Sequence, residues 1–63
     1  MTKTKVNYTL QAFDEMLDII TEQLEQYWTN KEMWDSLNIA RMHVIDARAT
    51  YSAVTSKLLL ATD

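Results

Sequence analysis

The sequence predicts an all-α fold, an antiparallel two-helix hairpin that dimerises into a four-helix bundle. Apolar residues recur at alternating steps of four and three through two long segments, which is the pattern of helices buried along one stripe. The stripe changes phase near residue 28, and the 63 residues include neither Gly nor Pro. Folds rich in turns lean on those two residues, so helices joined by a short connection fit better. We therefore expect one helical-hairpin domain over residues 1–63.

The first helix is expected at about residues 8–27, after a partly ordered arm at residues 1–7. We place Lys3 and Lys5 in the arm because a positive charge opposes the positive N-terminal end of a helix dipole. The candidate N-caps are Asn7 or Thr9 for this start, and Thr2 or Thr4 for an earlier one. The apolar seam of the first helix keeps an unbroken heptad spacing and consists of Val6, Leu10, Phe13, Leu17, Ile20, Leu24 and Tyr27.

The chain is predicted to reverse at about residues 28–30. Thr29 and Glu32 have the spacing of a capping box, in which the Thr29 side chain accepts from the Glu32 backbone N–H and the Glu32 carboxylate reaches back to the Thr29 N–H. Trp28 and Met33 would then form a hydrophobic staple across this cap. A single continuous helix is the competing interpretation, and it explains neither the capping box nor the change of phase.

The second helix is expected at about residues 30–60, with a seam of its own at the same spacing. This seam consists of Met33, Leu37, Ala40, Val44, Ala47, Tyr51, Val54, Leu58 and Ala61. In an antiparallel hairpin the two seams meet in layers, and the predicted register places Phe13 opposite Val44 and Val6 opposite Tyr51. Because the second helix is the longer one, its last turns, roughly three at 3.6 residues each, are expected to overhang the first helix.

The side of the second helix that faces away from its seam is also apolar. From residue 38 to 60, Asp46 is the only charged residue at the heptad positions b, c and f. A helix that is apolar nearly all round is buried on more than one side. One seam cannot offset an ordering cost of about 1.5 kcal/mol per residue, so a homodimer is expected. The predicted dimer interface consists of Ala49, Ser52, Ala53, Ser56, Leu59 and Leu60.

No catalytic, cofactor-binding or metal-binding residue is predicted, and the protein is not expected to be an enzyme. His43 and Asp46 lie one turn apart, but one His and no Glu-x-x-His do not fit the common di-iron pattern, and a structural role for His43 is favoured. The carboxylates of the first helix are interpreted as a solvated face, and zero Cys excludes a thiolate zinc site. Without a signal-peptide pattern or a membrane-length apolar stretch, a cytoplasmic protein without membrane contact is expected.

The predicted partner-binding residues lie along the second helix and at the hairpin tip. They are Trp34, Ile39, Arg41, Met42, Ile45 and Arg48. Aromatic and Arg side chains dominate the energetics of interfaces, and Met adapts to a target surface. For the two arginines an alternative stays open, in which they pair with carboxylates of the first helix.

The predicted function is that of a small non-enzymatic protein-binding module, an adaptor or inhibitor that engages another protein through the second helix and the hairpin tip. The layout is similar in outline to small plasmid- and phage-encoded helical-hairpin dimers, so a regulator or machine of a bacterial host is the kind of target expected. One alternative is a nucleic-acid-binding regulator of helical-hairpin type, and another is an acidic nucleic-acid mimic that uses the first helix. Nucleic acid is the less favoured partner, because 9 acidic side chains stand against 6 basic ones.

Overall fold

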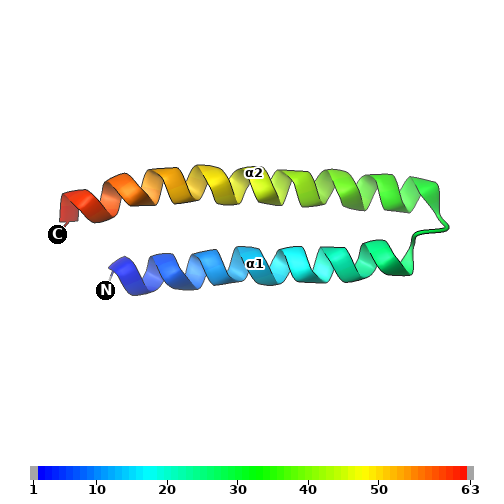
Figure 1. The fold of residues 1–63 in the computed structure, drawn as a ribbon, viewed down its shortest axis with the longest axis horizontal. Coiled ribbons are helices and arrows are strands. Elements are labelled where there is room, and N and C mark those ends of the chain that lie inside the picture. Colours follow the sequence, from blue (N-terminus) through cyan, green and yellow to red (C-terminus); the bar gives the residue numbers. More distant parts are fainter. Residues whose placement is uncertain (1, 63) are drawn as a thin grey trace.

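The chain forms two long α-helices that run antiparallel and lie side by side (Figure 1). The computed structural model describes residues 2–62, and its description of side chains covers residues 3–57 and 59. Helix α1 spans Thr2–Gln26 and helix α2 spans Lys31–Thr62, with a turn at residues 27–30. The Cα trace measures 49 × 16 × 8 Å, which is a rod one helix layer thick. The predicted all-α hairpin is confirmed.

Helix α1 begins at Thr2, so the prediction of a partly ordered arm before residue 8 is wrong. The reason is packing near this end, because Val6 is only 5% exposed. Burying a Val side chain contributes about 1.5–3 kcal/mol. Lys3 and Lys5 near the helix N-terminus each cost about 0.3–1 kcal/mol in an exposed setting that salt screens further. The burial therefore outweighs the unfavourable charges.

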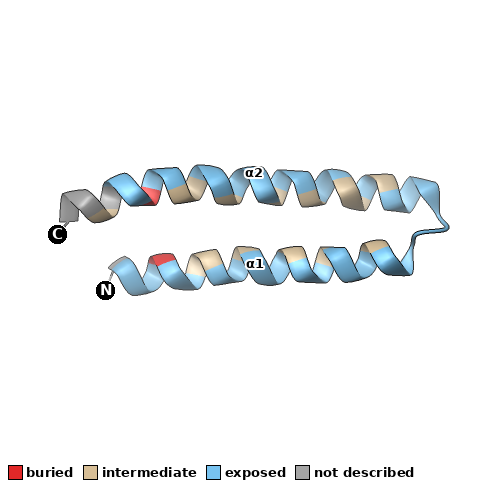
Figure 2. Cartoon of the chain, in the orientation of Figure 1, coloured by how far each residue is buried: buried red, intermediate tan, exposed pale blue. Residues whose placement is uncertain are grey.

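The seam predicted for α1 is confirmed from Val6 to Leu24. All its members in that range are buried or half-buried, and they lie on the side of α1 that faces α2 (Figure 2). Tyr27 lies past the last residue of α1 and is exposed, so the seam stops one step earlier than predicted. The large apolar side chains of this seam all lie along one side of α1, and this is the side that packs against α2.

The seam predicted for α2 is only partly right. Leu37, Val44 and Tyr51 are half-buried as expected, but the predicted seam positions that alternate with them are exposed, namely Met33, Ala40, Ala47 and Val54. In their place α2 turns Arg41, Arg48 and Thr55 toward α1. Arg can bury its aliphatic stem while its charged head stays in water, whereas Ala has little surface to bury.

Thr55 is the polar residue that α2 packs near the N-terminal end of α1. It is 5% exposed, and its hydroxyl donates to the Ser52 carbonyl oxygen at 3.1 Å. Because this hydroxyl is hydrogen-bonded within its own helix, its burial does not cost the free energy that burying an unpaired polar group would cost. Thr55 can therefore occupy a seam position for which the sequence pattern favoured Val54.

The register of the hairpin differs from the predicted layers by about one to two helical turns. Phe13, predicted opposite Val44, packs on Tyr51 with ring centroids 5.8 Å apart, and the neighbouring Asp14 contacts Arg48. The physical reason is visible in Figure 1, where α2 begins beyond the point at which α1 ends, so the turn advances along the rod as well as crossing it.

The predicted overhang of about three turns at the end of α2 is largely absent. Because α1 starts at Thr2, it runs along most of the second half of α2 (Figure 1). Leu59 is half-buried. The side chains of Leu58 and Leu60, which were also expected in the overhang, lie outside the described residues.

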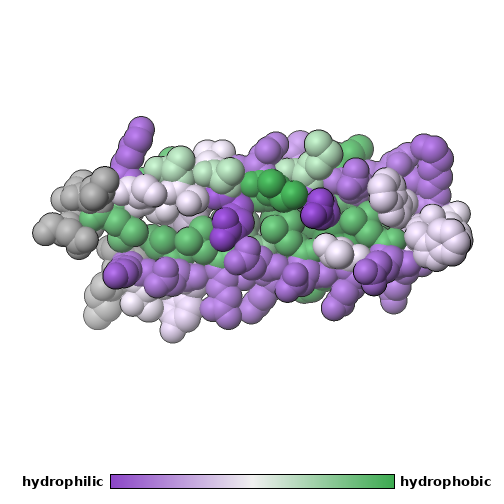
Figure 3. Space-filling view, in the orientation of Figure 1, coloured by the Kyte–Doolittle hydropathy of each residue, from purple (hydrophilic) through white to green (hydrophobic). Residues whose placement is uncertain are grey.

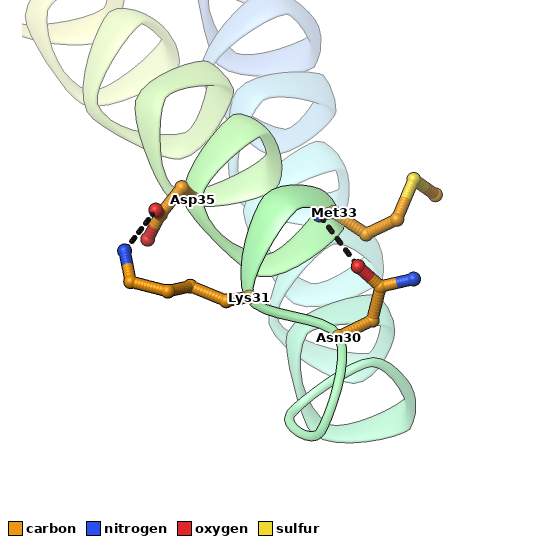
Figure 4. A network of polar contacts seen from close by, with 4 residues as sticks. All are labelled: Asn30, Lys31, Met33 and Asp35. Carbon is orange, nitrogen blue, oxygen red and sulfur yellow. Dashed lines mark hydrogen bonds and ion pairs between the residues drawn. The ribbon is translucent and has the colours of Figure 1, made fainter.

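The turn is capped by Asn30, and the predicted capping box of Thr29 with Glu32 is wrong. Asn30 Oδ1 accepts from the backbone N–H of Met33 at 3.2 Å (Figure 4). The Asn30 carbonyl accepts from the Trp34 N–H at 2.8 Å. Asn is at least as good an N-cap as Thr, and it stands directly before the first helical residue. The predicted staple is also wrong, because Trp28 is 74% exposed.

The reversal needs no glycine. The Asn30 N–H donates to the Tyr27 carbonyl at 2.9 Å and closes a four-residue turn. Among the described residues none has a positive φ, so every position of the turn is open to ordinary side chains. This explains how a chain without Gly reverses direction.

Candidate functional site

Two contacts between the helices mark the two broad faces of the hairpin. Arg48 donates from Nε to Asp14 Oδ1 at 2.9 Å on one face, and the rings of Phe13 and Tyr51 meet on the other. Phe13 belongs to the seam of α1, and Asp14 follows it about 100° further around the helix, outside the seam. We call the broad side that carries the Arg48–Asp14 contact the Asp14–Arg48 face and the opposite side the Phe13–Tyr51 face, and we assign the remaining residues to these faces by their angle around each helix, at about 100° per residue.

The Asp14–Arg48 face combines carboxylates of α1 with a mixed strip of α2. Helix α1 contributes Asp14, Asp18 and Glu25 to it, and all three are exposed. Figure 3 views the hairpin from this side, and hydrophilic side chains follow α1 along its whole length while apolar atoms lie between the helices. The strip on α2 consists of Trp34, Asn38, Arg41, Ile45, Arg48 and Ser52.

The structure brings four of the predicted partner-binding residues together and separates the other two. Trp34, Arg41, Ile45 and Arg48 lie on the Asp14–Arg48 face. The other two, Ile39 and Met42, project from the outer side of α2, away from α1, and are exposed.

The two arginines of the strip differ in what they contact. Arg48 makes the intrachain ion pair with Asp14 that the sequence left open as an alternative. Arg41 is half-buried and makes no hydrogen bond or ion pair within the described part of the chain. Its guanidinium is therefore the one on this strip that is available for a group from outside.

The predicted dimer-interface residues lie on the same half of the α2 surface as the predicted partner-binding ones. Ala49, Ala53 and Ser56 are exposed, and Ser52 is half-buried beside α1. The Ser56 hydroxyl donates to the Ser52 carbonyl at 2.9 Å, so this polar group is satisfied within α2. Leu59 is half-buried, and the side chain of Leu60 lies outside the described residues.

The hairpin tip carries aromatic side chains beside a charged pair. Trp28 is largely exposed, whereas Tyr27 and Trp34 are only slightly more than one-third exposed. Lys31 Nζ lies 2.8 Å from Asp35 Oδ2 one turn along α2 (Figure 4). The hydrogen bond and the charge of Asp35 raise the pKa of Lys31 above its ordinary value.

The described residues contain no group of three or more His, Cys, Asp or Glu side chains placed to hold a metal ion. His43 is exposed, and it makes no hydrogen bond to Asp46 or to any other residue of the described chain, so the structure gives no support to a hydrogen-bonded role for it. Over the same residues, neither helix has an apolar stretch of the length and hydropathy that crossing a membrane requires.

Sequence reasoning missed the Phe13–Tyr51 face as a surface. Its exposed residues on α2 were interpreted as seam positions of the second helix. The signal that could have revealed it is the opposite charge of Asp14 and Arg48, because pairing them rotates α2 and releases its alanines. The exposed apolar residues of this face are Ala12, Met16, Ile19, Met33, Ala40, Ala47 and Val54.

The fold and its surfaces define a small helical hairpin with exposed apolar side chains on more than one side. No protein-family model, curated protein sequence or solved structure matches this chain.

Proposed function

We propose that this chain is a small non-enzymatic protein-binding module, an adaptor or inhibitor that works in the cytoplasm as a homodimeric four-helix bundle. The observation that carries the proposal is the exposure of bulky apolar side chains on α2 away from α1. Ile39 and Met42 are each 56% exposed, and Ile45 lies beside them at the edge of the Asp14–Arg48 face. Exposed apolar patches rimmed by polar groups mark protein interaction sites.

The spacing on α2 suits a helix that lies in a groove of its target. Met42, Ile45 and Ala49 follow one another at steps of three and four, which is the anchor pattern of helix-in-groove recognition. Met is flexible enough to adapt to the walls of such a groove. Arg41, next to this stripe and without an ion pair in the described chain, would bind a carboxylate on the rim. Trp28 at the tip supplies an aromatic anchor.

A nucleic-acid-binding regulator has less support, because it needs a continuous basic face. Lys3 and Lys5 lie two residues apart on α1 and therefore point to different faces. The Arg48 guanidinium is engaged by Asp14. A gel shift with mixed DNA and RNA at several salt concentrations tests this alternative, and salt-dependent binding would favour it.

An acidic nucleic-acid mimic is favoured by one observation, the placement of Asp14, Asp18 and Glu25 on a single face. Charge reversal of Asp18 and Glu25 to Lys leaves the Asp14–Arg48 pair intact. Target binding that is lost in this variant supports a mimic. Target binding that is retained supports recognition through α2.

The experiment that tests the proposal starts from a target identified by affinity capture from the native host and mass spectrometry. The purified target is then titrated with the wild-type chain, with Met42→Glu and with Asn7→Glu. Asn7 is exposed on α1, so this control adds the same charge away from the α2 stripe. We expect Met42→Glu to retain helix content and dimer mass and to lose target binding, while the control binds as the wild type does.

Two results would contradict this assignment. Met42→Glu that loses its dimer would place Met42 in the contact between copies. Met42→Glu that keeps both its dimer and its target would remove the outer side of α2 from the site.

A further inference from the structure

We infer that a second copy of this chain covers the Phe13–Tyr51 face, so that the apolar core of the four-helix bundle forms there. This inference rests on the homodimer of the proposed function and assigns its interface. It moves the interface from the stripe that contains Ala49 and Ala53 to the opposite side of α2. The residues that would meet the second copy are Ala12, Met16, Ile19, Ala40, Ala47 and Val54.

The lone hairpin exposes more surface area than is expected of a compact monomer of its mass. A folded monomer of 7.4 kDa is expected to expose about 4,200 Å². The chain exposes 5117 Å². The excess of about 900 Å² is close to the roughly 800 Å² that each partner buries in an interface of standard size. The excess area is therefore sufficient for one interface of standard size with a second copy.

The thickness of the molecule leads to the same conclusion. The Cα trace is 8 Å thick in its shortest direction, which is one layer of helices. Stable domains consist of at least two packed layers around a common core. Of the described residues, Val6 is the only buried apolar one in the single layer, and even it is 5% exposed. A second hairpin stacked on the first supplies the missing layer.

The distribution of charge selects the face that meets its own copy. In a two-fold dimer the same patch lies on both sides of the interface, so every charge on that patch must be desolvated when the patch is buried. The Asp14–Arg48 face carries Asp14, Asp18 and Glu25 beside Arg41 and Arg48, and of these only Asp14 and Arg48 form an ion pair within the described chain. Burying this face would therefore cost the desolvation of several charged side chains. The Phe13–Tyr51 face carries fewer charges: Glu15 borders it, beside Ala12 and Ile19, and Lys5 stands near the end of the rod.

The shapes on the Phe13–Tyr51 face also suit self-association. Met16, Ile19 and Val54 are bulky and project into solvent, with exposures of 42%, 54% and 59%. Ala12, Ala40 and Ala47 are small and alternate with them, so large side chains of one copy can pack over small ones of the other. This arrangement leaves Ile39 and Met42, on the outer side of α2, free for the target.

The first test compares two alanines of α2 that lie two residues apart. Ala47→Glu places a charge on the Phe13–Tyr51 face, and Ala49→Glu places the same charge on the other side of the helix. Ala47 and Ala49 are both exposed in the single chain. In sedimentation equilibrium at micromolar concentration we expect Ala47→Glu to be a monomer and Ala49→Glu to be a dimer. A dimer in both variants, or dissociation of Ala49→Glu alone, would overturn the assignment.

The second test uses the wild-type protein, so it does not depend on whether a variant folds. Met16 and Met42 are similarly exposed in the single chain but lie on different sides of the hairpin. Dilute peroxide converts accessible Met to the sulfoxide, and mass spectrometry follows each site separately. We expect Met16 to be oxidised several-fold more slowly than Met42 at concentrations where the dimer forms, and at a similar rate on dilution.

The outcomes separate this inference from the proposed function. Protection of Met42 with free oxidation of Met16 would overturn the assigned face and leave the homodimer standing. A wild-type chain that sediments as a monomer would overturn both the homodimer and the face. Target binding through the outer side of α2 is measured independently with Met42→Glu.

Discussion

Removal of the Asn30 side chain is the most direct test of how the hairpin turns. Asn30 Oδ1 satisfies the Met33 N–H, one of the free donors at the start of α2, over 3.2 Å. Loss of an N-cap side chain costs about 0.5–2 kcal/mol. Because this bond is long and solvent-exposed, we expect Asn30→Ala to lie in the lower half of that range, at about 1 kcal/mol. In a domain of this size that lowers the melting temperature by roughly 4–8 °C.

The matched control is Thr29→Ala, which truncates the neighbouring residue that the capping-box pattern favoured. Urea unfolding of both variants should be followed by circular dichroism at one fixed protein concentration, since the stability of an associating chain depends on concentration. Asn30→Asp keeps the acceptor and adds a negative charge at the helix N-terminus, so it should be at least as stable as the wild type. A larger loss from Thr29→Ala than from Asn30→Ala would refute the reasoning.

Three further predictions concern packing and charge. Val6→Ala should lower the free energy of unfolding by about 1–2 kcal/mol in urea unfolding, and no loss would contradict packing of the first turns of α1 on α2. A double-mutant cycle of Phe13→Ala and Tyr51→Ala should give a coupling energy of about 0.5–1.5 kcal/mol, and a value near zero would contradict the register. The pKa of Lys31 measured by NMR should lie above its ordinary 10.5, and it should fall toward 10.5 in Asp35→Asn. Because the pKa of Lys31 is raised in the folded state, the pair with Asp35 stabilises the fold below the ordinary pKa, and this stabilisation is lost as the pH rises through the raised pKa.

The first helix could be predicted from the sequence because its core positions are all occupied by large apolar residues. From Val6 to Leu24 one stripe has no competitor of similar size, so the packed side of α1 follows from spacing alone. The start of α1 could not be predicted, because the unfavourable charge of Lys near a helix N-terminus can be recognised from the local sequence alone, whereas the burial of Val6 against α2 depends on the other half of the chain. The stabilisation from burying Val6 is larger than the cost of the charges.

The candidate site was predicted in part for the same reason. The exposure of Ile39 and Met42 follows from their distance to any possible seam, and the structure places both on the outer side of α2. The pairing of Arg48 with Asp14 depends on the register of two segments 34 residues apart, which spacing within one helix does not determine. The same register decides that Arg41 lies beside α1 without a partner in the described chain.

The phase of α2 explains both the error in the predicted seam and the proposed contact between copies. A periodic pattern counts Ala40 and Ala47 as core positions equal to Leu, although an Ala gains little from burial. Packing the Arg41 and Arg48 stems instead turns Val54 outward, together with both alanines, onto the side where Met16 and Ile19 are exposed.

The energy left unused on that side is large for so small a chain. Met16, Ile19 and Val54 are 42%, 54% and 59% exposed, so burying the rest of each side chain would contribute roughly half of the 1.5–3 kcal/mol of full burial. The net stability of a whole small domain is only about 5–15 kcal/mol. A lone hairpin that forgoes this burial is marginal, and the proposed association would recover it. The midpoint of thermal unfolding should therefore rise with protein concentration, and a midpoint that does not change with concentration would mean that the single hairpin is stable without a second copy.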